Sequence, residues 1–78
     1  MTYEQIETFL TVVTLGSITA ASTELFVSQS TVSARIQSLE AELGAQLIIR
    51  SRGHRNLELT SYGQAFIPLA SQWTSLWK

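Results

Sequence analysis

Residues 16–44 read GSITAASTELFVSQSTVSARIQSLEAELG, and this stretch predicts two helices joined by a tight turn. Ser17 can cap a first helix over residues 18–25, and Ser28 can cap a second over residues 29–43, because a serine hydroxyl accepts from the free amides of a helix start. Each helix carries apolar residues at three-to-four-residue spacing. The stretch therefore predicts a helix-turn-helix.

The second of these helices has two different sides. Its apolar stripe consists of Val32, Ile36, Leu39 and Leu43. Its opposite side, called the polar face below, carries small or uncharged residues, namely Ser30, Ser33, Ala34, Gln37 and Ser38. The major groove of B-form DNA admits one helix, and small side chains let its backbone approach the bases. This face is expected either to lie in that groove or to be an ordinary solvated helix surface.

Working outward, the flanking residues complete a small domain. Thr2 opens a capping-box pattern, and apolar periodicity predicts a helix over residues 3–15. Downstream, the β-prone segments 47–49 and 57–59 flank RSRGHRN at 50–56, which predicts a hairpin with a basic tip. The expected fold is mainly α: a winged helix-turn-helix of three helices plus a two-stranded β-hairpin wing, followed by a long linker helix.

The charge of the chain is unevenly distributed. The formal net charge is −1, so bulk attraction to nucleic acid is not expected, yet three of the five basic residues lie in the hairpin tip. Arg52 and Arg55 can meet flanking phosphates or enter the minor groove, whose negative potential favours guanidinium groups. Arg50 directly follows the apolar run and can instead pair with Glu58, so it ranks below them. A solvated hairpin tip is the alternative.

From a cap at Thr60, a fourth helix is expected over residues 61–78. Apolar residues at heptad-like spacing predict a helix–helix seam, here for dimerisation: Phe66, Leu69, Trp73, Leu76 and Trp77. Stacking of the two tryptophans on nucleic acid is a weaker alternative. Pro68 removes one helical hydrogen bond, so the helix is expected to bend there or to begin later.

Several classes of function are disfavoured by composition. The 78 residues hold one domain, without a long apolar segment or a signal-peptide pattern, so a soluble, cytoplasmic protein with no membrane contact is expected. Cysteine is absent, and His54 is the one histidine, which cannot complete a metal site or a general-base constellation. We expect no enzyme activity, no metal and no cofactor.

The ordered motif from Gly16 to Gly44 resembles the LysR-type transcriptional regulators. The residues that carry the resemblance are Gly16-Ser17-Ile18-Thr19-Ala20-Ala21, Leu25, Val27-Ser28-Gln29-Ser30, Val32-Ser33, Ile36, Leu39-Glu40, Leu43-Gly44, Leu47, Arg50, Leu59-Thr60 and Gly63. The resemblance implies a DNA-binding domain over residues 1–60 and a truncated linker helix over 61–78, with the effector-binding domain absent. Pro68 is also similar to the family pattern, which favours a bent helix.

The resemblance further implies partners and contact residues. It implies a homodimer through antiparallel linker helices, a possible tetramer at full length, an interrupted dyad as the DNA site, and a small-molecule inducer bound by the missing domain. The DNA-binding positions that match the family are Ser28, Gln29, Ser30, Thr31, Ser33 and Arg35, with Arg52 and Arg55 in the wing. Ala34 and Gln37 depart from the family, which often has basic residues there, so fewer phosphate anchors are expected.

Sequence-specific binding of double-stranded DNA is therefore the leading hypothesis, with helix 29–43 in the major groove and wing 50–56 on the flanking backbone or minor groove. The alternative is a winged-helix module that binds another protein, which the near-neutral charge would permit.

Overall fold

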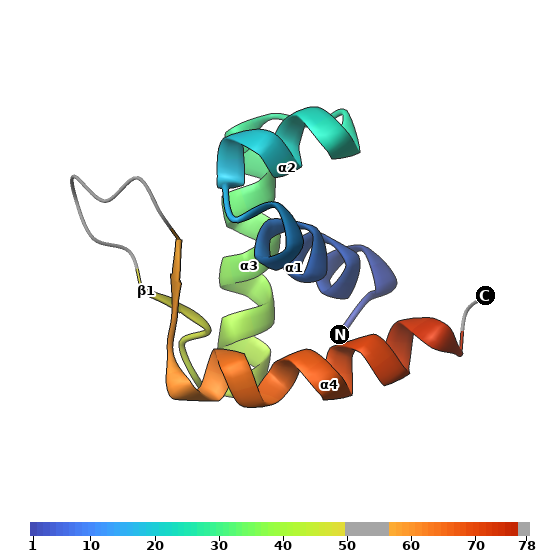
Figure 1. The fold of residues 1–78 in the computed structure, drawn as a ribbon, viewed down its shortest axis with the longest axis vertical. Coiled ribbons are helices and arrows are strands. Elements are labelled where there is room, and N and C mark those ends of the chain that lie inside the picture. Colours follow the sequence, from blue (N-terminus) through green and yellow to red (C-terminus); the bar gives the residue numbers. More distant parts are fainter. Residues whose placement is uncertain (50–56, 77–78) are drawn as a thin grey trace.

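A computed structural model describes residues 1–49 and 57–76 of the chain. Within these ranges the elements, in chain order, are α1 (Tyr3–Leu15), α2 (Ile18–Leu25), α3 (Gln29–Leu43), β1 (Ile48–Ile49), β2 (Glu58–Leu59) and α4 (Ser61–Ser75) (Figure 1). The predicted winged helix-turn-helix is confirmed. Both strands are shorter than expected.

Hydroxyl caps decide where the helices begin. Thr2, Ser17, Ser28 and Thr60 each accept a hydrogen bond from a backbone N–H of the helix that follows. These bonds satisfy amides that have no partner within the helix, which is why the sequence located the helix starts well. Pro68 lies inside α4, which already begins at Ser61, so the later start that the sequence left open is wrong.

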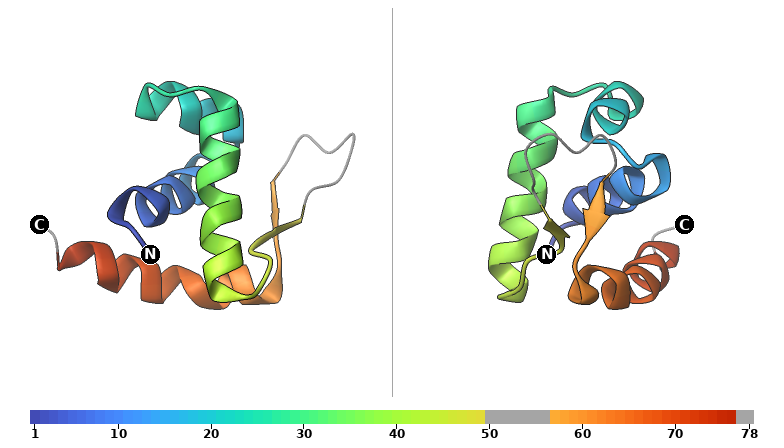
Figure 2. Two further views of the ribbon diagram at one scale, coloured as in Figure 1. Left: turned by 180° about the vertical axis from the view of Figure 1, so that it is seen from behind. Right: turned by 60° about the vertical axis from the view of Figure 1, so that its left-hand side comes forward.

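The core forms where α1 meets the three other helices. α1 contacts α2, α3 and α4, and α4 runs along the base of the domain (Figures 1 and 2). Phe9 of α1 packs against Phe66 of α4 with ring centroids 5.7 Å apart. The apolar stripe of α3 supplies the buried side chains of Val32, Ile36 and Leu39. α3 is therefore held by its inner side, and its polar face is left outside.

The hairpin stands beside α3 at one edge of the molecule (Figure 2). β1 and β2 are antiparallel, with Ile48 opposite Leu59 and Ile49 opposite Glu58. Leu47 and Ile48 are fully buried, which anchors the base of the hairpin in the core. In the described part of the chain, no helix is long and apolar enough to cross a membrane.

Candidate nucleic-acid interface

The predicted division of α3 into two sides is present in the structure. Ser30, Ala34, Gln37 and Ser38 are exposed and Ser33 is half-buried, while the apolar stripe points inward. Gln29, at the start of the helix, is also exposed. Residues 28–38 contain no Asp or Glu, so this half of α3 offers hydroxyl and amide groups without a carboxylate that would repel phosphate.

Hydroxyl groups form a small network at the amino end of α3. The Ser28 Oγ accepts from the Thr31 backbone N–H at 3.1 Å and donates to the Thr31 Oγ1 at 2.9 Å. Its distance to the Ser30 Oγ is 3.0 Å. Since Ser28 has one hydroxyl proton, which goes to Thr31, the proton of this last contact comes from Ser30. The helix-cap role predicted for Ser28 is thus confirmed, and its hydroxyl is already occupied locally.

Arg35 lies against α1 rather than standing out from the polar face. It is half-buried, and its Nη1 donates to the Thr8 Oγ1 of α1 at 3.4 Å, which is a long hydrogen bond. It is the only Lys or Arg side chain within residues 1–49 and 57–76. This contact uses one of its five N–H donors, so Arg35 can position α3 on α1 and still present donors to a phosphate.

Arg50, Arg52, His54 and Arg55 lie outside the described residues, and so does the whole tip segment 50–56.

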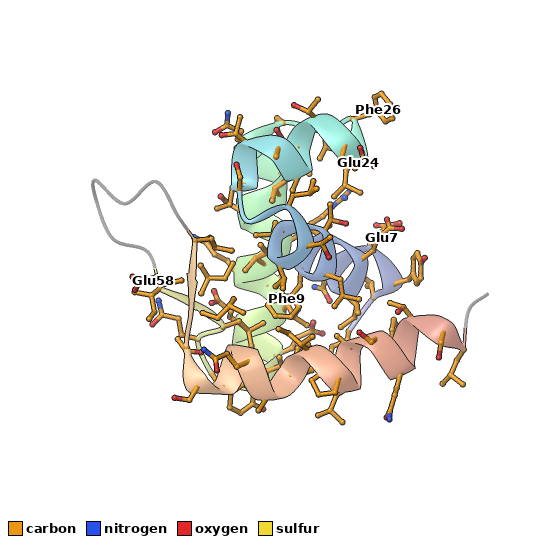
Figure 3. The ribbon with its side chains drawn as sticks, viewed as in Figure 1. Glu7, Phe9, Glu24, Phe26 and Glu58 are labelled. Atoms are coloured by element: carbon orange, nitrogen blue, oxygen red, sulfur yellow. The ribbon has the colours of Figure 1, made fainter. Side chains whose placement is uncertain are left out.

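One acidic residue, Glu4 of α1, lies beside the polar face, where it lines a hollow together with Thr31, Ala34, Arg35 and Ser38 of α3. Glu7 and Glu24 are on the side of the domain opposite the hairpin, and Glu58 is on β2 (Figure 3). The pKa of the Tyr3 hydroxyl is raised, first by desolvation and then by the neighbouring Glu7 carboxylate, with which it also shares a hydrogen bond. Tyr3 is on α1 and lies beside Glu7 and Glu24, so this ionisation does not concern the polar face.

The predicted dimer seam on α4 divides between two sides of the helix. Phe66 is 6% exposed and belongs to this domain's own core, because Gly63, Phe66 and Ala70 form the inner side of α4. Trp73 is half-buried against the core, and Trp77 lies outside the described residues. Phe66 therefore has little surface left to offer to a second copy.

The exposed apolar residues of α4 follow a regular spacing. Tyr62 is 46% exposed, Leu69 is 60% exposed and Leu76, the C-cap, is 83% exposed. They are seven residues apart, so they lie along one line of the helix, here called the outer stripe. Sequence reasoning included Leu69 and Leu76 but did not select Tyr62, because it did not distinguish the two sides of α4.

Phe26 is a feature that sequence reasoning missed. It ends α2 with φ 59° and ψ 41°, in the left-handed region, and its side chain is 94% exposed. Figure 3 shows its ring at the outer end of α2, pointing away from the domain. An exposed aromatic residue in this conformation contributes no packing to the core. The sequence signal for it was its position directly after the periodic apolar residues of α2, where the helix ends.

The chain matches the family model of bacterial regulatory helix-turn-helix proteins, lysR family, over residues 3–64. It is 42% identical over 67 residues to the transcriptional regulator TcbR of Pseudomonas sp. strain P51, covering 86% of this chain and 22% of TcbR. It is also 42% identical over 71 residues to a probable RuBisCO transcriptional regulator of Cyanidioschyzon merolae, covering 91% of this chain and 23% of that protein.

A solved structure shares the whole architecture. The crystal structure of the CbnR DNA-binding domain in complex with DNA superposes with a TM-score of 0.89 at 39% identity, covering 97% of this chain and 85% of that one. The chain spans about a quarter of the length of the curated relatives that it matches. On the family match and on this shared architecture, the chain belongs to the lysR family of bacterial regulatory helix-turn-helix proteins.

Proposed function

We propose that this domain binds double-stranded DNA in a sequence-specific manner, with α3 in the major groove and residues 50–56 on the flanking backbone or in the minor groove. The observation that carries the proposal is the amino-terminal half of α3, which exposes hydroxyl and amide groups and bears no carboxylate. Its capped amino end carries the positive end of the helix dipole, which favours nearby phosphate.

The proposed contacts fall into two kinds. Base edges are read by Gln29, Ser30 and Ser33, where an amide can bond an adenine in bidentate fashion and short hydroxyl side chains allow close approach. Phosphates are held by the other positions, namely Thr31, Arg35, Arg52 and Arg55, and by Ser28 where its hydroxyl exchanges the bond to Thr31 for one to a phosphate. With Ala34 and Gln37 uncharged, most of the positive charge in this interface would come from the wing.

The DNA complex of the CbnR domain supports this proposal, because that domain has the same fold and 39% identity over nearly the whole chain. TcbR and the RuBisCO regulator are both named as regulators of transcription, and TcbR comes from a bacterium, in which transcription takes place in the cytoplasm. We propose the same role and place for this protein, as a regulator without catalytic activity or cofactor.

For the whole protein we propose a homodimer through the linker helix 61–78, which follows the DNA-binding domain 1–60. Leu69 and Leu76 supply its exposed apolar surface, and Trp73 and Trp77 stand near them in the sequence. A twofold dimer presents two copies of α3 to an interrupted dyad, since half-site spacing mirrors protein symmetry. Tetramer formation and response to a small-molecule inducer would belong to the longer protein, with its effector-binding domain.

Selection of duplexes from a random library by the purified domain tests this function. The expected result is a shared sequence motif, and binding that weakens linearly on a log–log salt plot with a slope of about −0.9 per phosphate contacted. Random recovered sequences would contradict sequence-specific reading. Failure to bind any duplex at low salt would favour the alternative, a winged-helix module that binds protein.

A further inference from the structure

The start of the hairpin, at Leu47 and the first residue of β1, is held by a side chain of α3. The Glu40 Oε2 accepts hydrogen bonds from the backbone N–H of Leu47 at 2.7 Å and of Ile48 at 3.3 Å. Both of these residues are fully buried, and Glu40 itself is half-buried. Hydrogen bonds to a carboxylate are shorter and stronger than those between neutral groups, so this contact ties the strand firmly to the helix.

The other side of this start, at Gln46 and Leu47, is held by the segment that leads into α4. The Thr60 N–H donates to the Leu47 carbonyl at 3.1 Å, and the Thr60 hydroxyl donates to the Gln46 carbonyl. Gly63 approaches so closely that a Cβ there would overlap the Leu47 carbonyl oxygen. Leu47 is thus clamped between Glu40 on one side and the start of α4 on the other.

We propose that Glu40 is a positioning residue, which fixes the hairpin relative to the polar face of α3 so that both reach one duplex. This inference rests on the proposed DNA binding. Each strand has only two residues. Their few hydrogen bonds are too weak a constraint to fix the orientation of the hairpin relative to α3. A small rotation at Leu47 would turn β1 and the paired β2 relative to α3, and productive contacts tolerate errors of only about 0.5 Å.

Three substitutions at Glu40 separate positioning from charge. Glu40→Gln keeps an oxygen that accepts from Leu47 and Ile48, in weaker uncharged hydrogen bonds, and is expected to keep the hairpin in its parental position. Glu40→Ala removes the acceptor. Glu40→Asp keeps the carboxylate but shortens its reach, and serves if the alanine variant does not fold. Glu42→Ala is the matched control, because Glu42 is exposed on the same helix and bonds the amino terminus of Met1.

Spin-label distances test the geometry without DNA. The chain has no cysteine, so labels can be attached through Gln37→Cys on α3 and Glu58→Cys on β2, both of which are exposed. The parent, Glu40→Gln and Glu42→Ala should give one narrow distance distribution. Glu40→Ala and Glu40→Asp should give a broadened or shifted one, at a temperature where circular dichroism shows folded protein. A narrow parental distribution in both variants would overturn the inference.

DNA binding tests the consequence, using a duplex selected by the parent. Glu40→Ala should weaken binding by about tenfold or more and lower the salt slope by about two, as Arg52→Ala with Arg55→Ala should do. A protein with all three substitutions should bind DNA little more weakly than Glu40→Ala alone or the double arginine variant, since in Glu40→Ala the wing is already misplaced. Full additivity would overturn the inference. If the arginine variants bind like the parent while the distances still broaden, the positioning stands and the proposed wing contact is wrong.

Discussion

α3 and α4 are both 15 residues long, and both bury one side in the same core, yet they leave opposite chemistry on the surface. The polar face of α3 exposes hydroxyls, amides and a methyl group, all compatible with water. α4 exposes the outer stripe of Tyr62, Leu69 and Leu76. The polar face of α3 is well hydrated when free and exchanges this water for polar partners on binding. Burial of the outer stripe of α4, by contrast, lowers the free energy of the protein. We infer that α3 binds its partner reversibly and that α4 packs against a more permanent partner.

The largest effect is expected from making α3 resemble α4. Ser33→Leu places a branched apolar side chain in the middle of the polar face, which would hold the helix away from the base edges. We expect operator affinity to fall by on the order of a hundredfold, comparable with one or two mismatched base pairs. Binding is measured by fluorescence anisotropy.

Circular dichroism and urea unfolding provide the control for this change. Since Val32, Ile36 and Leu39 remain in place, the unfolding midpoint should stay near that of the parent. Parental affinity in a folded Ser33→Leu protein would show that the polar face does not meet DNA.

The reverse change makes α4 resemble α3. Leu69→Ser with Leu76→Ser removes apolar area from the outer stripe, which at about 25 cal/mol per Å² weakens a dimer by a few kcal/mol. Sedimentation equilibrium at several concentrations should show a shift from dimer to monomer. Binding to a duplex with two half-sites should fall by about tenfold, and binding to a single half-site should change little. A parent that is monomeric at every concentration would contradict the assignment of this stripe.

Trp73→Ala is a less specific probe of the same interface. Trp73 is half-buried against the core of its own domain, so its truncation would also destabilise the monomer by a few kcal/mol. A lower unfolding midpoint is expected together with the loss of dimer, whereas the two leucine substitutions should leave the monomer fold unchanged. This difference separates packing within the domain from packing between copies.

A smaller effect is expected from the wing. Arg52→Ala and Arg55→Ala should each lower the salt slope by about one and weaken all duplexes nearly equally, because phosphate contacts carry no sequence information. The selected sequence motif should not change. The opposite result, a changed motif with an unchanged slope, would assign these residues to base reading.

Sequence patterns located the elements well because caps and apolar periodicity are local. Ser28 capped α3 as predicted, and the inward stripe of α3 followed from its spacing. Phe66 lies in the core of its own domain because α4 packs on Phe9, which heptad spacing alone cannot reveal, and its place in a dimer seam remains a prediction. The bonds from Glu40 to Leu47 and Ile48 span a loop, so no periodic pattern predicts them. The bounds 1–60 and 61–78 remain a prediction.

The smallest effect on DNA binding is expected at Phe26. This residue is an exception to the contrast between α3 and α4, because it is an exposed apolar side chain next to the polar start of α3. Phe26 is an almost fully exposed apolar side chain at the turn before α3, and it adopts a left-handed conformation that suits glycine. A side chain there costs about 1–2 kcal/mol of strain, part of which glycine loses again through its greater freedom when unfolded. Phe26→Gly should therefore stabilise the domain by a net of about 1 kcal/mol.

For a domain of this size, that gain corresponds to a rise in Tm of roughly 4–8 °C. DNA affinity should stay within about twofold of the parent, because the ring points away from the domain and makes no core contact (Figure 3). Phe26→Ala is the matched control: it removes the same ring but keeps a Cβ in the left-handed region, so its stability should stay close to that of the parent. Equal stabilisation in both variants would assign the effect to the exposed ring and not to the backbone. A large loss of DNA affinity in both variants would place this apolar residue in the interface, next to the polar residues at the start of α3.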